Sequence, residues 1–135
     1  MKISVALATY NGAQYLREQL DSIAKQTILP FELVVSDDGS TDQTLDIILD
    51  FASTVSFPVR ILENKQKLGY RRNFLHVAKA CYGEAVAFCD QDDIWHNDKL
   101  ERAGKALRHK DVLLFHHEAE TFSDKENINT KKIQK

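Results

Sequence analysis

The sequence predicts an α/β domain built on an open, mostly parallel sheet with helices on both faces. The first observation behind this prediction is that short, continuous apolar runs alternate with segments whose apolar residues recur every three to four positions. The second is that polar and acidic residues directly follow three of the apolar runs. Parallel α/β sheets bind their ligands at the carboxyl ends of the strands, so the second observation supports the first.

The elements are expected in strict alternation along the chain. Continuous or alternating apolar runs predict strands at 3–8, 31–36, 59–62, 85–89 and 112–115. Helical spacing predicts helices around 16–24, 45–52, 74–81 and from 97 to about 107. Ser40 and Gln43 match the S-x-x-Q capping pattern, which predicts that the second helix begins at Ser40.

Composition and charge exclude several classes of protein. A chain of 135 residues is one domain, and its net charge of -2 offers no basic excess for a general nucleic-acid binder. No apolar run reaches the ~18 residues of a membrane span, and no signal-peptide pattern is present. Cys81 and Cys89 lie in apolar segments and are expected to be reduced thiols. These features predict a cytoplasmic protein.

The segment after the first strand, Thr9–Gly12, carries hydrogen-bonding groups at Thr9 and Asn11 and a flat ring at Tyr10. It fits a binding loop. It fits equally well a plain strand-to-helix turn in which Asn11 and Gly12 tolerate positive φ.

Two carboxylates, Asp37 and Asp38, stand together after the second strand. Adjacent acids at the mouth of a parallel sheet repel each other unless they bind something, which favours a functional role.

A denser acidic cluster follows the fourth strand, where Asp90, Asp92 and Asp93 fall within four residues. Carboxylate oxygens suit hard ions such as Mg²⁺ or Mn²⁺, and such an ion can bridge to a diphosphate. The alternative is a solvated acidic turn.

A basic segment, 65–73, opens the third helix. Helix N-termini attract anions, so Arg71 or Arg72 could reach a phosphate. A solvated basic turn explains the segment equally well.

Taken together, four stretches resemble the family 2 glycosyltransferases of the GT-A fold. They are residues 4–12, 31–42, 68–74 and 88–95, which occur in family order and spacing and cover about residues 1–122. The Asp-Gln-Asp-Asp-Ile-Trp form of the last stretch is similar to the branch that includes bacterial rhamnosyltransferases. The resemblance implies a Rossmann-like GT-A sheet whose 1–122 part binds a nucleotide sugar.

The resemblance also implies roles for individual residues. Thr9 and Tyr10 would line the base pocket, Asp38 would contact the base or ribose, and Asp90-Gln91-Asp92 stands where the family has its DXD motif. Asp92, with Asp90, would hold a divalent cation, Mg²⁺ or Mn²⁺, on the diphosphate. The full set of expected nucleotide-sugar contacts is Thr9, Tyr10, Asn11, Asp37, Asp38, Arg72, Asp90 and Asp92.

The family reaction is an inverting transfer from a UDP- or dTDP-sugar to a saccharide or lipid-linked acceptor, in cell-surface polysaccharide synthesis. Family members carry the general base well beyond the DXD motif, so the base is expected beyond the end of this chain, which then resembles a truncated N-terminal part. A partner chain, or peripheral association with the inner face of the membrane, is compatible with that expectation.

The polar tail, 123–135, has no periodic apolar face and is predicted to be disordered. Two alternative functions remain. One is a non-catalytic nucleotide-sugar-binding module. The other is a signalling receiver domain, which Thr9 and Tyr10 disfavour because such a domain places an acidic pair after its first strand.

Overall fold

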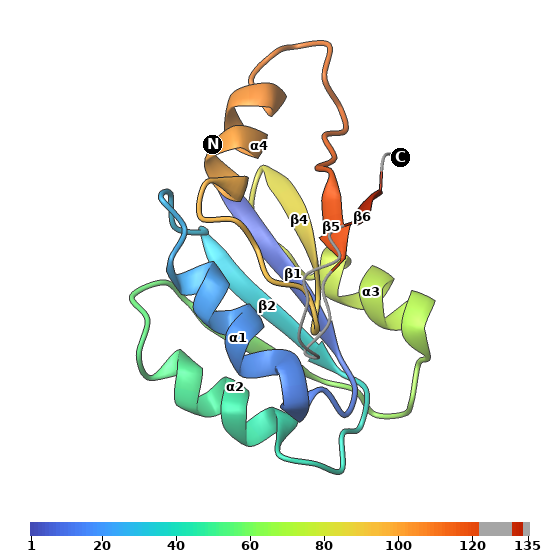
Figure 1. Ribbon diagram of the computed structural model, residues 1–135. Coiled ribbons are helices and arrows are strands. Elements are labelled where there is room, and N and C mark those ends of the chain that lie inside the picture. Colours follow the sequence, from blue (N-terminus) through green and yellow to red (C-terminus); the bar gives the residue numbers. More distant parts are fainter. Residues whose placement is uncertain (122–130, 134–135) are drawn as a thin grey trace.

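A four-stranded parallel sheet forms the centre of the protein in the computed structural model, which describes residues 1–121 and 131–133 (Figure 1). The strands are β1 (Ile3–Thr9), β2 (Glu32–Asp37), β3 (Val59–Glu63) and β4 (Ala85–Asp90), in the spatial order β3-β2-β1-β4. The chain therefore builds outward from β1 to β3 and then returns to the other side of β1. This reversal places a topological switch point between the ends of β1 and β4.

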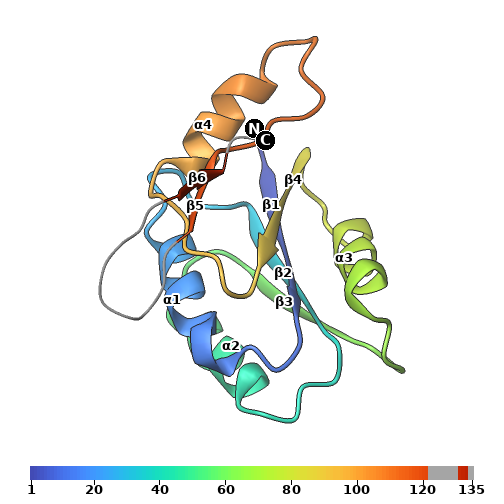
Figure 2. The ribbon, with the colours of Figure 1, turned by 45° about the vertical axis from the view of Figure 1, so that its right-hand side comes forward.

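Helices cover both faces of the sheet, as predicted. Helices α1 (Ala13–Ala24) and α2 (Thr44–Ala52) lie on one face, and α3 (Tyr70–Lys79) lies on the other (Figure 2). Helix α4 (Lys99–Leu107) joins α1 and α2, because its Leu100 belongs to the same buried cluster as Leu16 and Ile48. Val77 of α3 packs in a smaller cluster against the opposite face.

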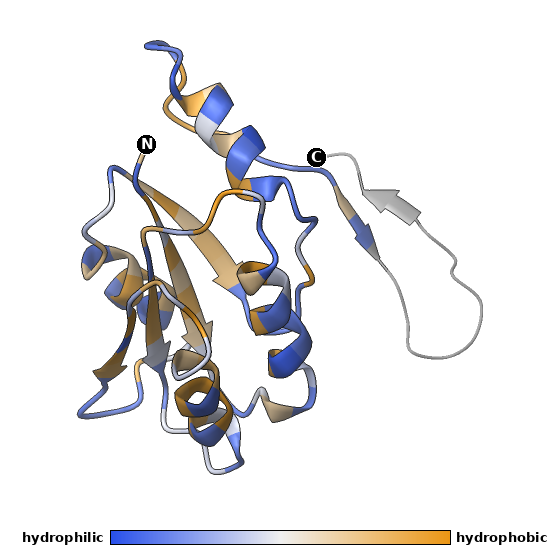
Figure 3. Cartoon of the chain, turned by 90° about the vertical axis from the view of Figure 1, so that its left-hand side faces the viewer, coloured by the Kyte–Doolittle hydropathy of each residue, from blue (hydrophilic) through white to orange (hydrophobic). Residues whose placement is uncertain are grey.

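The strands differ in how completely they are buried. Every residue of β1 and β2 is buried, which follows from their central positions between two helical layers. Strand β4 alternates instead, with Cys89 fully buried and Phe88 57% exposed. Hydrophobic residues accordingly concentrate in the strands, while the helices mix hydrophobic and hydrophilic residues (Figure 3).

The strand predicted at 112–115 is not formed. The segment is irregular, and the side chains of Leu113 and Leu114 are 93% and 83% exposed. Residues 112–117 line one wall of a groove of about 500 Å³ whose other wall includes β4, so the two segments are not paired. A short apolar run becomes a strand only where a ladder partner is within reach, and here a groove intervenes.

Two short strands follow this segment. Strand β5 (Ala119–Thr121) pairs antiparallel with β6 (Lys131–Ile133). Of the tail predicted to be disordered, 123–130 and 134–135 lie outside the described residues. The described piece, Lys131–Ile133, is a strand, which the polar composition does not predict. Within the described ranges, no helix has the length and apolar character needed to cross a membrane.

Candidate functional site at the carboxyl edge of the sheet

Strand register brings the predicted site residues to one edge. Thr9 is the register partner of Asp37, and Ala8 is the partner of Asp90. Because the strands are parallel, the segments that follow β1, β2 and β4 leave the sheet at the same end. The acidic segment after β4 and the polar segment after β1 therefore flank the switch point, where α/β sheets form a crevice for ligands.

Asp37 organises the turn after β2. Its Oδ1 accepts hydrogen bonds from Thr9 Oγ1 at 2.7 Å and from Ser40 Oγ at 2.6 Å, and its Oδ2 accepts one from the Ser40 N–H at 2.9 Å. The residue is 7% exposed. These bonds satisfy a buried carboxylate without a cation and tie β1 to the turn.

The prediction that Ser40 caps the second helix is wrong, because the Ser40 hydroxyl bonds to Asp37 and Asn11 instead. Helix α2 begins at Thr44, and no side-chain hydrogen bond caps it at Gln43. The Ser40 hydroxyl donates to Asp37 and accepts from the Asn11 N–H at 2.8 Å instead. The hydroxyl is used to join two loops, and the helix begins one turn later.

Asp38 ties the end of β2 to the loop before α3. Its two carboxylate oxygens accept the N–H groups of Leu68 at 2.7 Å and Gly69 at 2.9 Å. Burial pushes the pKa of Asp38 upward, but these backbone donors outweigh it, so the pKa is lowered and the group is ionised. Asn64 Nδ2 also donates to Asp38 Oδ1, at 3.4 Å, so three of the roughly four lone-pair sites of this carboxylate are occupied and one is left for a ligand.

Tyr10 and Asn11 shape the end of β1. Asn11 has a φ of 47° and its Oδ1 accepts from the Thr41 N–H at 2.8 Å, so Asn11 takes the left-handed conformation while Gly12 does not. Tyr10 is 43% exposed, and the Lys67 ammonium lies 3.8 Å from the centre of its ring. The flat face expected to bind a base is thus partnered by a cation in this structure.

The acidic segment after β4 carries uncompensated charge. Asp92 is exposed and Asp90 is half-buried, and neither forms a salt bridge with a Lys or Arg in the part of the chain that is described. Burial, with the charges of Asp90 and Asp92, raises the pKa of Asp93. The charge of Asp90, followed by burial, raises the pKa of Tyr70, whose hydroxyl donates to Asp90 at 3.3 Å.

Asp90 and Asp92 fit a divalent cation whose coordination is completed by the phosphate oxygens of a bound ligand and by water. Within residues 1–121 and 131–133, no group of three or more His, Cys, Asp or Glu side chains is already arranged to hold a metal. Mg²⁺ is commonly held by one or two carboxylates together with phosphate oxygens and water. Asp90 and Asp92 supply such a pair, and their oxygens are the donors that Mg²⁺ and Mn²⁺ prefer.

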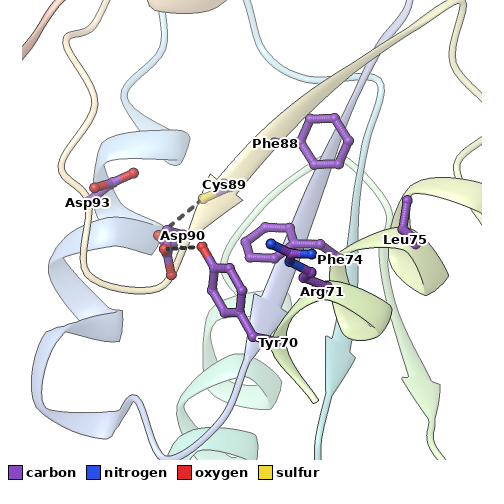
Figure 4. A pocket seen from close by; sticks show the side chains of 8 residues that line it. All are labelled: Tyr70, Arg71, Phe74, Leu75, Phe88, Cys89, Asp90 and Asp93. Atoms are coloured by element: carbon purple, nitrogen blue, oxygen red, sulfur yellow. Dashed lines mark hydrogen bonds between the residues drawn. The ribbon is translucent and has the colours of Figure 1, made fainter. Parts of the chain in front are cut away.

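The basic residues of α3 divide between two directions. Both Arg71 and Arg72 are exposed, but only Arg71 lines a cavity of about 550 Å³ together with Tyr70, Phe88, Asp90 and Asp93 (Figure 4). Arg71 therefore shares a cavity with two residues of the acidic segment, and Arg72 does not. The phosphate contact assigned to Arg72 stays a prediction.

Three residues at this edge were not predicted. Gln91 forms two hydrogen bonds with the backbone of Tyr10, Lys67 covers the Tyr10 ring, and Tyr70 donates to Asp90. Each bridges segments far apart in sequence, and no local spacing signals such a contact. The position of Gln91 between two acids was the one available indication.

A parallel sheet whose switch point is flanked by an acidic segment is typical of ligand-binding α/β proteins. The sequence matches the family described as Glycosyl transferase family 2 over residues 4–134. The chain belongs to this family, and its sheet and helices are those of the GT-A fold.

Curated relatives support the same family. The chain is 37% identical over 119 residues to an uncharacterised glycosyltransferase of Nostoc sp., covering 87% of the chain and 36% of the relative. It is 41% identical over 119 residues to the poly(ribitol-phosphate) beta-N-acetylglucosaminyltransferase TarS of Staphylococcus aureus, covering 84% and 20%. It is 39% identical over 101 residues to the dTDP-rhamnosyl transferase RfbG of Shigella flexneri, covering 72% and 35%.

Solved structures agree in fold. A fragment of S. aureus TarS, residues 1–349, in complex with UDP superposes with a TM-score of 0.69 at 36% identity, covering 80% of the chain and 32% of the fragment. The mannosyltransferase PcManGT from Pyrobaculum calidifontis, in complex with GDP-Man and Mn²⁺, superposes with a TM-score of 0.75 at 30% identity, covering 82% and 33%. The chain spans roughly a fifth to a third of the length of these curated relatives and solved chains.

Proposed function

We propose that this chain is the donor-binding part of a glycosyltransferase that moves a sugar from a nucleoside diphosphate sugar to a saccharide or lipid-linked acceptor. The observation that carries the proposal is the pairing of β1 with β4, which sets the Tyr10 segment beside an acidic segment without salt bridges in the described residues. The UDP bound to TarS and the GDP-Man and Mn²⁺ bound to PcManGT support a nucleotide-sugar donor with a divalent cation.

The proposed contacts divide the donor between the two segments. Thr9 and Tyr10 bind the base, and Asn11 holds that loop in its left-handed turn. Asp38 uses its remaining acceptor capacity on the base or ribose, with Asp37 bracing the turn beneath it. The UDP bound to TarS and the name of the dTDP-rhamnosyl transferase RfbG favour a UDP- or dTDP-sugar, and a cytoplasmic site of action is proposed for such a donor.

The acidic segment serves the diphosphate in this proposal. Asp92, with Asp90, holds Mg²⁺ or Mn²⁺, and Arg72 or its neighbour Arg71 contacts phosphate. When bound, the cation offsets the negative charge that develops on the leaving nucleoside diphosphate. An inverting transfer also needs a base that takes the acceptor proton, and we assign that base to no residue of this chain.

The test is calorimetry of UDP, dTDP and GDP binding, with and without Mn²⁺. Asp92→Asn keeps the side-chain shape and removes one charge, so binding in Mn²⁺ should weaken at least about tenfold while metal-free binding stays near the parent value. The matched control is Asp21→Asn on the exposed side of α1, which should bind like the parent. Equal binding by Asp92→Asn and the parent in Mn²⁺ would contradict the proposal.

A donor-binding module without transfer activity is the second candidate, because no base is assigned within the chain. Turnover by the purified chain, with a donor panel and a rhamnose-containing acceptor, separates the two. Glycosyl transfer supports the enzyme. Tight donor binding with neither transfer nor donor hydrolysis supports the module.

A further inference from the structure

Gln91 joins the two segments that flank the switch point. Its Oε1 accepts the N–H of Tyr10 at 2.9 Å, and its Nε2 donates to the Tyr10 carbonyl at 3.0 Å. A primary amide presents an N–H donor and a carbonyl acceptor side by side, so it can bind both the N–H and the carbonyl of a single strand residue. The side chain therefore continues the β1–β4 ladder beyond its last paired residues, Ala8 and Asp90.

Gly12 lies directly against the Gln91 amide. A Cβ at Gly12 would lie 2.2 Å from Gln91 Oε1 and 2.5 Å from its Cδ. The backbone of Gly12 has φ −101° and ψ 11°, which any residue can adopt. Glycine is needed here for the close approach of the Gln91 amide rather than for its conformational freedom.

We propose that Gln91 is a positioning residue that couples the two halves of the donor site. The proposal rests on the function proposed above, in which Tyr10 binds the base and Asp92 the metal on the diphosphate. Gln91 sits between them in sequence and space, with Asp90 and Asp92 on either side of it along the chain. By holding the acidic segment at a set distance from Tyr10, it lets one ligand engage both halves without first ordering one against the other.

The coupling is measured by the ratio of the Kd for UDP without Mn²⁺ to the Kd with Mn²⁺. Gln91→Ala should lower this ratio about tenfold, because two neutral hydrogen bonds and the alignment they impose are lost. Gln14→Ala, an exposed glutamine on α1, is the matched control and should leave the ratio unchanged. A purely structural role predicts that both Kd values rise together and the ratio stays constant, which would overturn the proposal.

Gly12→Ala tests the same contact from the other side. The added methyl displaces the flexible end of Gln91 without removing it, so the ratio should fall as in Gln91→Ala. In the double variant Gly12→Ala/Gln91→Ala the ratio should fall no further than in either single variant, because the hydrogen bonds between Gln91 and Tyr10 are already lost. Additive losses would show that Gly12 acts independently of Gln91 and would also overturn the proposal.

The two proposals fail in different ways. If the parent protein binds UDP equally well with and without Mn²⁺, the ratio is already one and the proposed function fails. If the parent shows a clear dependence and Gln91→Ala and Gly12→Ala keep the full ratio, only the role of Gln91 fails. Should Gln91→Ala not fold, as judged by its unfolding transition, Gly12→Ala alone decides between these outcomes.

Discussion

The two ends of β2 both carry buried acids, and the protein treats them in opposite ways. At the amino end, Glu32 is 3% exposed and pairs with Arg60 through Nε at 3.0 Å and Nη2 at 2.9 Å. At the carboxyl end, Asp37 and Asp38 accept only hydroxyl, amide and backbone N–H groups, and no salt bridge reaches them from the described residues.

This difference separates an acid whose charge is cancelled by a cation from acids that keep their charge, although hydrogen bonds hold Asp37 and Asp38 in the fold. The charge of Glu32 is cancelled by a guanidinium that also lies 4.3 Å from the ring centre of Tyr82, so little field extends into solvent. The acids at the carboxyl edge keep their charge, and a cluster of uncancelled charges in a crevice is a typical feature of a binding site. The following predictions measure that contrast on one scale, the free energy of unfolding in urea.

The largest effect is expected at the amino end. Glu32→Ala leaves Arg60, the Ser4 hydroxyl and the Tyr82 N–H without their shared partner, and should cost about 3 kcal/mol. The control is Asp50→Ala, which breaks an exposed pair with Arg17 and should cost under about 1 kcal/mol. Similar losses for the two variants would remove the distinction between a buried and a surface pair here.

An intermediate effect is expected for Asp38→Asn. Asparagine keeps the shape but sets an N–H₂ group against the backbone N–H of Leu68 or Gly69, so the loss should be about 2 kcal/mol. Because the folded protein lowers the pKa of Asp38 below 3.8, the ionised group stabilises the fold at neutral pH.

The pH dependence of that loss has a definite sign. The stabilisation from Asp38 should be fully present above its ordinary pKa of 3.8 and should disappear as the pH falls below it. The difference in unfolding free energy between the parent and Asp38→Asn should therefore shrink from neutral pH toward pH about 3. A difference that stays constant with pH would mean that the loss reflects shape rather than charge.

The smallest effect is expected for Asp92→Asn, the variant that should weaken metal-dependent binding most. Asp92 is exposed at the carboxyl edge, and removing its charge relieves repulsion from Asp90 and Asp93. Its unfolding free energy should stay within about 0.5 kcal/mol of the parent. A loss above about 1 kcal/mol would class Asp92 with Glu32 as an acid that stabilises the fold.

The sequence predicted the sheet well, because β1 and β4 are mostly apolar, and β2 and the shorter β3 still have three apolar residues each. The four parallel strands fall within a residue or two of their predicted bounds, and the helices lie on both faces as expected. The strand predicted at 112–115 does not form, because two of its apolar side chains pack on the wall of a groove instead of in the sheet. Val112 and Phe115 are half-buried on a groove wall, while Leu113 and Leu114 face solvent.

The sequence predicted that the candidate site residues share one edge of the sheet, but it did not predict the contacts that they make there. Thr9, Asp38 and Asp92 stand at the carboxyl ends of strands. Because the carboxyl ends of parallel strands lie at the same edge of a sheet, this placed them together. Which partner each polar group chooses depends on distances across the fold. Ser40 had a plausible local acceptor pattern and used Asp37 and Asn11 instead, and Gln91 reaches a backbone 81 residues earlier.

The alternation of β4 has a consequence for which mutations the chain can tolerate. Cys89 is fully buried and Phe88 faces outward, so a slip of one residue against β1 would exchange them and would also pull Gln91 away from Tyr10. The burial of Cys89 in the hydrophobic core therefore fixes the register of β4, and that register sets the position of Gln91 at the carboxyl edge. Along 85–91 a change of side chain is a local event, whereas the gain or loss of a single residue alters the core and the crevice together.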